Sequence, residues 1–137
     1  MLSVFEWPVR VYYEDTDAGG VVYYANYLKF MERARTEWLR ELGFGQETLM
    51  REAGILFAVR QLTIDYILPA RFDDALVVDV GIDSLSKVSM SFRQRILRAP
   101  DTVLSVATVK VVCLDKVTFR PTAIPANIRE KLQDAQH

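Results

Sequence analysis

Apolar residues recur at helical spacing along one stretch of the chain, from about Asn26 to Leu42. They fall three or four positions apart, and charged residues take the positions between them. This periodicity predicts one long amphipathic helix with a wide apolar face. Asn26 is expected to be its N-cap, and Gly43 is expected to lie just beyond its end. The apolar positions are Tyr27, Met31, Ala34, Trp38 and Leu42.

Most of the remaining chain has β character. The run from Val4 to Tyr13 predicts an edge strand, or one that starts after Pro8, because proline has no N–H to donate to a ladder. A short helix is predicted at 46–53, stopped by Gly54, and another at 126–133. Four further strands are predicted between these helices, with short breaks that favour antiparallel neighbours: 55–68, 75–85, 88–98 and 103–114.

The last two of these strands differ in pattern. In the segment 88–98, apolar Val88, Met90, Phe92 and Ile96 alternate with polar Ser89, Ser91, Arg93 and Arg95, which predicts one buried and one solvated face. The segment 103–114 is more uniformly apolar, which is typical of a central strand.

The order of the elements predicts an α+β fold in which one long helix packs on one face of a curled antiparallel sheet. A chain of 137 residues fits a single domain spanning 1–137. Because one principal helix leaves a sheet edge and a face uncovered, we expect self-association into a dimer or tetramer.

Charge and composition narrow the range of partners. Lys+Arg 17 against Asp+Glu 18 gives a net charge of -1, which argues against nucleic acid or an anionic membrane surface as the main partner. No stretch approaches the ~20 apolar residues of a membrane span. The start, MLSVFEWPVR, lacks the pattern of a secretory signal, and the single Cys113 fits a reducing compartment. We therefore expect a cytoplasmic protein.

Several classes of catalytic mechanism depend on a residue that this sequence does not offer in a suitable place. The only histidine is His137, so Ser-His-Asp, Cys-His and histidine-based dehydratase chemistry are disfavoured. Cys113 lies within a predicted strand, which favours a buried structural thiol. No dinucleotide or P-loop motif indicates a cofactor. Asp15 to Gly20 resembles the start of a calcium loop, but Gly19 stands where a side-chain oxygen ligand is needed and Asn26 where a bidentate Glu is needed, so no metal is expected.

An acidic loop remains as the candidate site. Glu14, Asp15 and Asp17 precede Gly19 and Gly20, just before the long helix. A carboxylate there is favoured in its ionised form, and glycine and helix-start N–H groups can serve a developing oxyanion. The same acids can instead cap the helix and shape a turn. Spacing alone leaves capping and catalysis balanced.

Tyrosines are concentrated around this loop. Tyr23 and Tyr24 are predicted to lie beside an apolar acyl pocket, although aromatic residues of this kind can equally belong to the core.

The stretch VRVYYEDTDAGGVVYYANYLKFMERARTEWL resembles the opening motif of the hotdog-fold acyl-CoA thioesterases. The match is to the 4-hydroxybenzoyl-CoA thioesterase-like family, including its Tol-Pal-associated acyl-CoA thioesterase group. The later stretches TIDYILPARFDD, VKVVCLD and RPTAIP extend the resemblance over almost the whole chain. The resemblance implies a hotdog fold and dimers that join their sheets.

The resemblance also implies roles for individual residues. Asp17 falls on the family's catalytic carboxylate, which acts as nucleophile or as general base, and Tyr24 falls at the backbone oxyanion donor. The expected substrate-binding residues are Gly19, Gly20, Val21, Tyr23 and Asn26. Close relatives often carry histidine where this chain has Tyr24, so any catalytic role of that side chain is in question, whereas a backbone donor survives the change.

The sequence therefore predicts hydrolysis of the thioester of an acyl-CoA, or of an acyl carrier protein, to free acid and thiol without a cofactor. The alternative is a non-catalytic acyl-thioester-binding or scaffold protein of envelope or lipid-synthesis machinery. A thiol-release assay separates the two.

Overall fold

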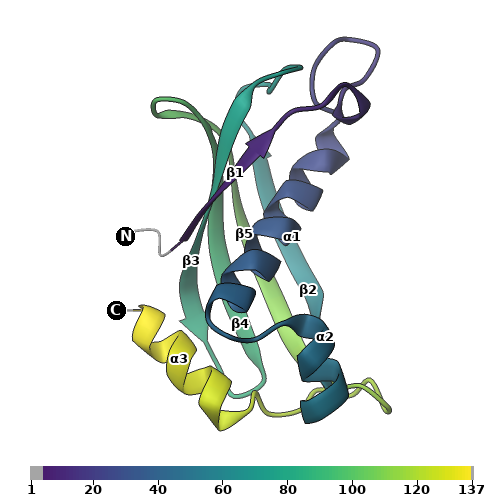
Figure 1. Cartoon of the computed structure of the whole chain (residues 1–137), viewed down its shortest axis with the longest axis vertical. Helices are drawn as coiled ribbons and strands as arrows, with labels where there is room; N and C mark the ends of the chain where they lie inside the picture. Colours follow the sequence, from purple (N-terminus) through teal and green to yellow (C-terminus); the bar gives the residue numbers. More distant parts are fainter. Residues whose placement is uncertain (1–4, 137) are drawn as a thin grey trace.

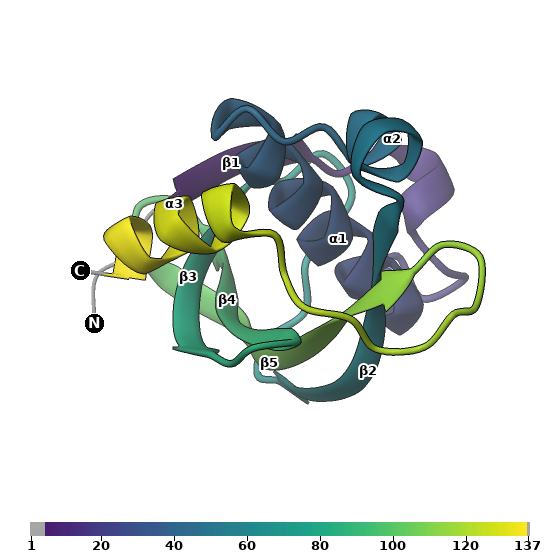
Figure 2. The same cartoon turned by 90° about the horizontal axis from the view of Figure 1, so that it is seen from below.

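One long helix lies against the concave face of a five-stranded antiparallel sheet (Figure 1). The structure is a computed structural model that describes residues 5–136, so His137 lies outside the described residues. The helix is α1 (Tyr24–Glu41), and Figure 2 shows the sheet curling around it. The α+β hotdog architecture predicted from the sequence is confirmed.

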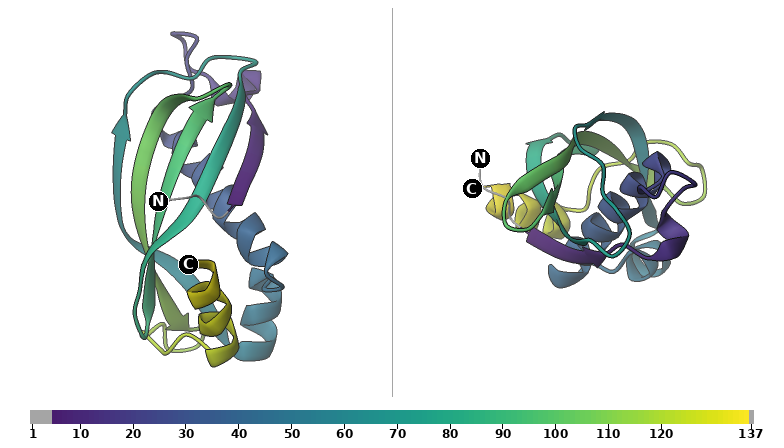
Figure 3. Two further views of the ribbon diagram at one scale, coloured as in Figure 1. Left: turned by 90° about the vertical axis from the view of Figure 1, so that its left-hand side faces the viewer. Right: turned by 90° about the horizontal axis from the view of Figure 1, so that it is seen from above.

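The sheet has the strand order β1-β3-β4-β5-β2. Its strands are β1 (Phe5–Arg10), β2 (Ile55–Tyr66), β3 (Ala75–Leu85), β4 (Ser89–Arg98) and β5 (Thr102–Asp115). The edge position of β1 and the interior position of β5 are confirmed. The prediction that β2 and β3 are neighbours is wrong, because β2 pairs with β5 at the opposite edge. The segment 67–74 instead crosses one end of the molecule to connect them (Figure 3).

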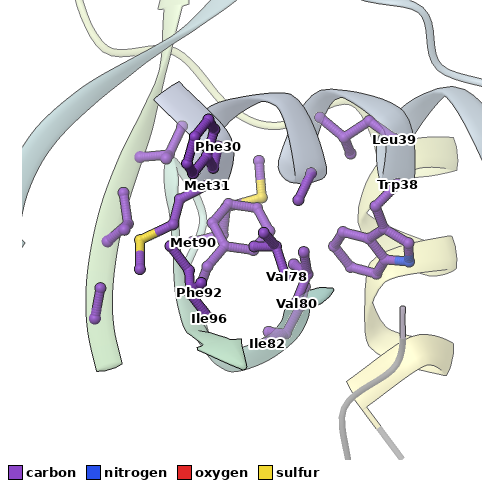
Figure 4. Close-up of a cluster of buried hydrophobic side chains, with 14 of the residues drawn as sticks. Phe30, Met31, Trp38, Leu39, Val78, Val80, Ile82, Met90, Phe92 and Ile96 are labelled. Carbon is purple, nitrogen blue, oxygen red and sulfur yellow. The ribbon is translucent and has the colours of Figure 1, made fainter. Parts of the chain in front are cut away.

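The core lies between α1 and the sheet, and β3, β4 and β5 supply most of its buried strand residues. Figure 4 shows Phe30, Met31, Trp38 and Leu39 of α1 meeting side chains of β3 and β4. The predicted alternation in β4 holds for Met90, Phe92 and Ile96, which are all buried. It fails at its start: Val88 precedes the strand and is half-buried, whereas Ser89 is buried, with its hydroxyl bonded to that of Ser86 at 2.7 Å.

The helix ends follow local chemistry. Helix α1 begins two residues earlier than predicted, with Tyr23 as its N-cap, so the assignment of Asn26 as N-cap is wrong. Gly43 follows the C-cap with φ of 98°, as expected for a residue beyond a helix end. The predicted short helix is present as α2 (Gln46–Thr48) and η2 (Leu49–Ala53), which end at Gly54.

The C-terminal helix α3 (Ala126–Gln136) is three residues longer than predicted and packs against β3. In residues 5–136, no helix is both long and apolar enough to cross a membrane.

Candidate active site

A tight loop between η1 (Tyr13–Asp15) and α1 carries the predicted catalytic acid. The loop is closed by an antiparallel bridge between Thr16 and Val22, and the Asp17 N–H donates to the Val21 carbonyl at 2.9 Å. Gly20 turns the chain with φ of 81°, a left-handed conformation that glycine adopts without a Cβ clash. In Figure 1 the loop stands at the end of the molecule, beyond the first turn of α1. Asp17 is thus held on an exposed, hydrogen-bonded turn.

The Asp17 carboxylate is fixed through one oxygen. Its Oδ1 accepts the Gly19 N–H at 2.8 Å, while no described residue donates to Oδ2. The Gly20 N–H donates to the Asp17 carbonyl at 3.0 Å. The assumption that these two glycines offer free N–H groups is therefore wrong, because both groups are used within the loop. The Gly19 N–H fixes Oδ1 of the Asp17 carboxylate, and Oδ2 stays open.

The neighbouring acids have different surroundings. Asp15 accepts the Tyr12 N–H through Oδ2 at 2.8 Å, and its carbonyl accepts both the Tyr23 N–H and the Asn26 Nδ2 at 2.9 Å. Asp15 therefore ties the loop to the helix start. Glu14 is exposed and has no hydrogen-bond partner among the described residues. The capping alternative is wrong for α1, because the Asp15 carboxylate caps η1 and no side chain caps α1. The turn alternative holds for Asp17, whose Oδ1 accepts the N–H two residues on, so contacts alone do not single out Asp17 as catalytic.

The first turn of α1 presents open backbone donors. The Tyr23 N-cap makes no side-chain capping bond, and the first turn contains no acidic residue. The Asn26 N–H donates to the Tyr23 carbonyl at 2.8 Å. Among residues 5–136, no acceptor satisfies the N–H groups of Tyr24 and Ala25. These two donors, at the positive end of the helix dipole, are suited to bind a carbonyl oxygen that becomes negative.

An aromatic cleft lies beside this helix start. It has a volume of about 260 Å³ and is lined in part by Tyr24, Tyr27 and Tyr66. Tyr66, at the end of β2, meets Tyr24 and Tyr27 edge-on, with ring centroids 6.2 and 5.2 Å away. Tyr23 and Tyr24 are exposed and pack against each other at 4.8 Å. Tyr24 lines this cleft and Tyr23 does not, and the use of the cleft as an acyl pocket stays a prediction.

The segment 67–74 closes the site from the sheet side. The Val22 N–H donates to the Ala70 carbonyl at 2.8 Å, and the Ala70 N–H donates to the Tyr27 hydroxyl at 2.9 Å. Val21 forms a bridge with Arg71. Sequence reasoning did not connect Tyr66 or Ala70 with the site. Their only signal was the family-like stretch TIDYILPARFDD, which gave no indication of what it contacts.

Two of the shifted pKa values belong to residues discussed above, Cys113 and Tyr66. Burial raises the pKa of the Cys113 thiol to about 11, in agreement with its prediction as a structural residue. Burial, followed by the charges of Tyr24 and Tyr27, raises the pKa of Tyr66. No group of three His, Cys, Asp or Glu side chains within 5–136 is arranged to hold a metal ion.

The site thus combines a carboxylate with one free oxygen, two open N–H donors at a helix start, and an aromatic cleft between them and the sheet. These are the parts needed for attack on an acyl carbonyl. The predicted residues Asp17, Gly19, Gly20, Val21, Tyr23, Tyr24 and Asn26 all lie in this one loop and the helix start that follows it.

The sequence and the fold both have known counterparts. The sequence model of the thioesterase-like superfamily matches residues 11–132. An acyl-CoA thioester hydrolase, YbgC, of Escherichia coli is 52% identical over 126 residues, covering 92% of this chain and 93% of the relative. An acyl-CoA thioesterase, YbgC, of Haemophilus influenzae is 50% identical and covers 91% of both. A 1,4-dihydroxy-2-naphthoyl-CoA thioesterase from Synechocystis shares the fold with a TM-score of 0.88 at 24% identity, covering 97% of this chain and 98% of its own.

Proposed function

The chain belongs to the thioesterase-like superfamily, and from this premise we propose that it is an acyl-CoA thioester hydrolase. Relatives that match nearly its whole length and are at least half identical are named for this activity. The observation that carries the proposal for this chain is that one loop and the helix start after it hold both a free Asp17 oxygen and the open N–H groups of Tyr24 and Ala25.

The thioester carbonyl oxygen is placed against the Tyr24 N–H, with the Ala25 N–H beside it. In the general-base route, the free Asp17 oxygen takes a proton from water, and the resulting hydroxide adds to the carbonyl carbon. The N–H donors stabilise the oxyanion of the tetrahedral intermediate. Collapse breaks the carbon–sulfur bond, the thiolate receives the proton, and free acid and CoA thiol leave.

In the nucleophilic route, the Asp17 oxygen adds to the carbonyl carbon itself and the thiolate departs. The acyl group then forms an anhydride with the carboxyl, which water cleaves. Both routes use the same oxygen and the same donors, so the geometry supports Asp17 in either role. The backbone position of the donor explains why a tyrosine side chain at position 24 is compatible with activity.

The variant Asp17→Asn tests the assignment. The amide keeps an oxygen that can accept the Gly19 N–H, so the loop should survive, but it neither takes a proton nor attacks. We expect thiol release to fall by about a hundredfold to ten-thousandfold, with little change in melting temperature. Glu14→Gln is the matched control and should keep its activity. Full turnover by Asp17→Asn contradicts the catalytic role, and binding without turnover in the wild-type protein favours a scaffold.

We also propose self-association through β2. This edge strand is 12 residues long, whereas the other edge strand, β1, has 6 and contains Pro8. The unpaired outer edge of β2 therefore offers the longer run of backbone groups to a second copy. Light scattering across a concentration series should give a dimer or tetramer mass. A monomer throughout the micromolar range contradicts the proposal.

The proposal also covers the carrier of the acyl group and the cellular compartment of the protein. An acyl carrier protein can present the same acyl thioester, so acyl-CoA and acyl carrier protein with the same acyl group should be compared in the same assay. A cytoplasmic location fits a CoA-linked substrate and a single buried thiol. Fractionation of cells that produce the protein tests it.

A further inference from the structure

Three clefts line up along the seam between α1 and β2. The first is the aromatic cleft at the helix start. The second, of about 380 Å³, begins one turn further along, and the third, of about 170 Å³, follows it. The walls of the second cleft are largely apolar and come from Leu28, Met31, Val59 and Leu62. This seam is open because α1 packs its other side against β1, β3 and β4.

Arg35 lines both the second and the third cleft, so it stands where they meet. Its side chain is buried, with only 8% of the residue exposed. The Nη1 group donates to Gln94 Oε1 at 2.9 Å, and Gln94 Nε2 donates to the Met31 carbonyl at 3.0 Å. Gln94, itself fully buried in β4, thus aims the guanidinium.

This buried cation has no anion beside it. Across residues 5–136, no carboxylate lies within ion-pair distance of Arg35. Burial lowers the pKa of its guanidinium, but an arginine in a protein remains charged. A guanidinium offers five donors, of which Gln94 takes one, and among the described residues no side-chain nitrogen is both shielded from solvent and without a partner. The remaining donors are available to an acceptor in the seam.

The acid that lines the same clefts does not fill this role. Glu32 lines the same two clefts, but its Oε2 accepts the Thr36 hydroxyl at 3.1 Å, and its side chain is exposed. Its charge favours the cationic form of Arg35 from a distance. A carboxylate that entered the seam would therefore bind Arg35 against some repulsion from Glu32.

We propose that Arg35 binds a carboxylate at the far end of the acyl chain, so that the enzyme accepts CoA thioesters of dicarboxylic acids. This inference rests on the proposed function, because it takes the thioester to lie at Tyr24. Tyr24 and Arg35 are eleven positions apart in α1, or ~16 Å along the helix axis at ~1.5 Å per residue. Helical side chains lean toward the N-terminus, which brings the guanidinium closer to the thioester.

Each part of such a substrate has a matching group along the seam. The open N–H groups take the thioester carbonyl, the apolar walls take the methylene chain, and the guanidinium takes the terminal carboxylate in a charge-assisted hydrogen bond. An acyl chain that ends in a methyl group would reach the same depth but leave the buried cation without an anion.

The test compares thioesters that differ only at the far end. Succinyl-, adipoyl- and suberoyl-CoA are set against butyryl-, hexanoyl- and octanoyl-CoA, and kcat/KM is measured by thiol release. For at least one acyl length, the kcat/KM of the wild-type protein should be higher for the thioester that ends in a carboxylate than for the one that ends in a methyl group. In Arg35→Met, the ratio of kcat/KM for the two members should fall by about tenfold to a hundredfold, mainly through KM. Arg35→Lys, which keeps the charge, should retain part of the preference.

Arg33→Met is the matched control, because Arg33 lies on the same helix but is exposed and lines neither cleft. It should leave the ratio unchanged. A wild-type protein without any carboxyl preference overturns the inference, and so does an unchanged ratio in Arg35→Met. If Arg35→Met alters only the oligomeric mass, the anion belongs to a second copy and the inference is wrong. Absence of thiol release from every thioester is instead the failure of the proposed function itself.

Discussion

The Tyr66 hydroxyl donates a hydrogen bond of 3.1 Å to the main-chain carbonyl of Tyr24. This bond joins the end of β2 to the first turn of α1, 42 residues away in sequence. The carbonyl belongs to the residue whose N–H is the proposed oxyanion donor. A tyrosine hydroxyl is protonated at neutral pH, and burial raises the pKa of Tyr66 further, so the hydroxyl can donate this bond in the range where the enzyme would work.

We predict that Tyr66→Phe reduces kcat more than it reduces stability. The change removes the hydroxyl that positions Tyr24 but keeps the ring that packs against Tyr24 and Tyr27. Loss of one partly exposed hydrogen bond costs about 1 kcal/mol, which corresponds to a rate effect of roughly fivefold if the bond acts on the transition state. Stopped-flow or steady-state thiol release measures the rate, and thermal unfolding measures stability.

Tyr13→Phe is the control for this prediction. Tyr13 is 81% exposed, and no described residue bonds its hydroxyl, so the same chemical change there should leave kcat as it is. Equal losses in the two variants would show that the Tyr66 hydroxyl has no special place in the site.

A second prediction concerns the loop glycines. Gly20→Ala should lower the free energy of unfolding by about 1 kcal/mol, because its φ of 81° is unfavourable for a residue with a Cβ. Gly45→Ala is the matched control: Gly45 has φ of -66°, and an added Cβ would meet only Thr48 Oγ1 at 3.8 Å. Urea unfolding of both variants measures the difference. An equal loss in both variants would contradict the strain argument.

A third prediction follows from the buried thiol. The pKa of Cys113 is raised from 9.0 to about 11 in the folded protein, so folding favours the protonated form. Its contribution to stability is complete below pH 9 and is lost as the pH rises toward 11, by roughly 3 kcal/mol in all. Melting temperatures should fall more steeply with pH over this window in the wild-type protein than in Cys113→Ala.

The same burial predicts slow chemistry at Cys113. With its side chain fully buried, the thiol should react with iodoacetamide at pH 8 only as fast as the protein unfolds. Rapid alkylation of the native protein, or loss of thioester hydrolysis in Cys113→Ala at a temperature where it is folded, would contradict the structural role.

Local pattern was sufficient for most of the elements. The spacing of Tyr27, Met31, Ala34 and Trp38 predicted the face of α1 that is buried, because helical periodicity directly reports which side meets the core. The start of the helix was misplaced for a local reason. Asn26 has the side chain of an N-cap, but it is the third helical residue and bonds the Asp15 carbonyl instead.

The choice between the acids required contacts that spacing does not report. Asp15 and Asp17 are two residues apart and look equivalent as sequence. The structure shows that their contacts differ: one carboxylate accepts the Tyr12 N–H and the other the Gly19 N–H, and each keeps one oxygen without a partner among the described residues. The resemblance to thioesterases pointed to Asp17, and the geometry is consistent with that choice. Its catalytic role stays a prediction.

By itself, the sequence determined the α+β class, the strands, the amphipathic helix and the acidic loop before that helix, because each depends on residues that are close in the chain. Only the tertiary structure decided that β2 pairs with β5, that Tyr66 reaches Tyr24, and that Arg35 is buried without an anion. Each of these depends on how distant segments share one core, and the free energy of that packing is not encoded in any single stretch.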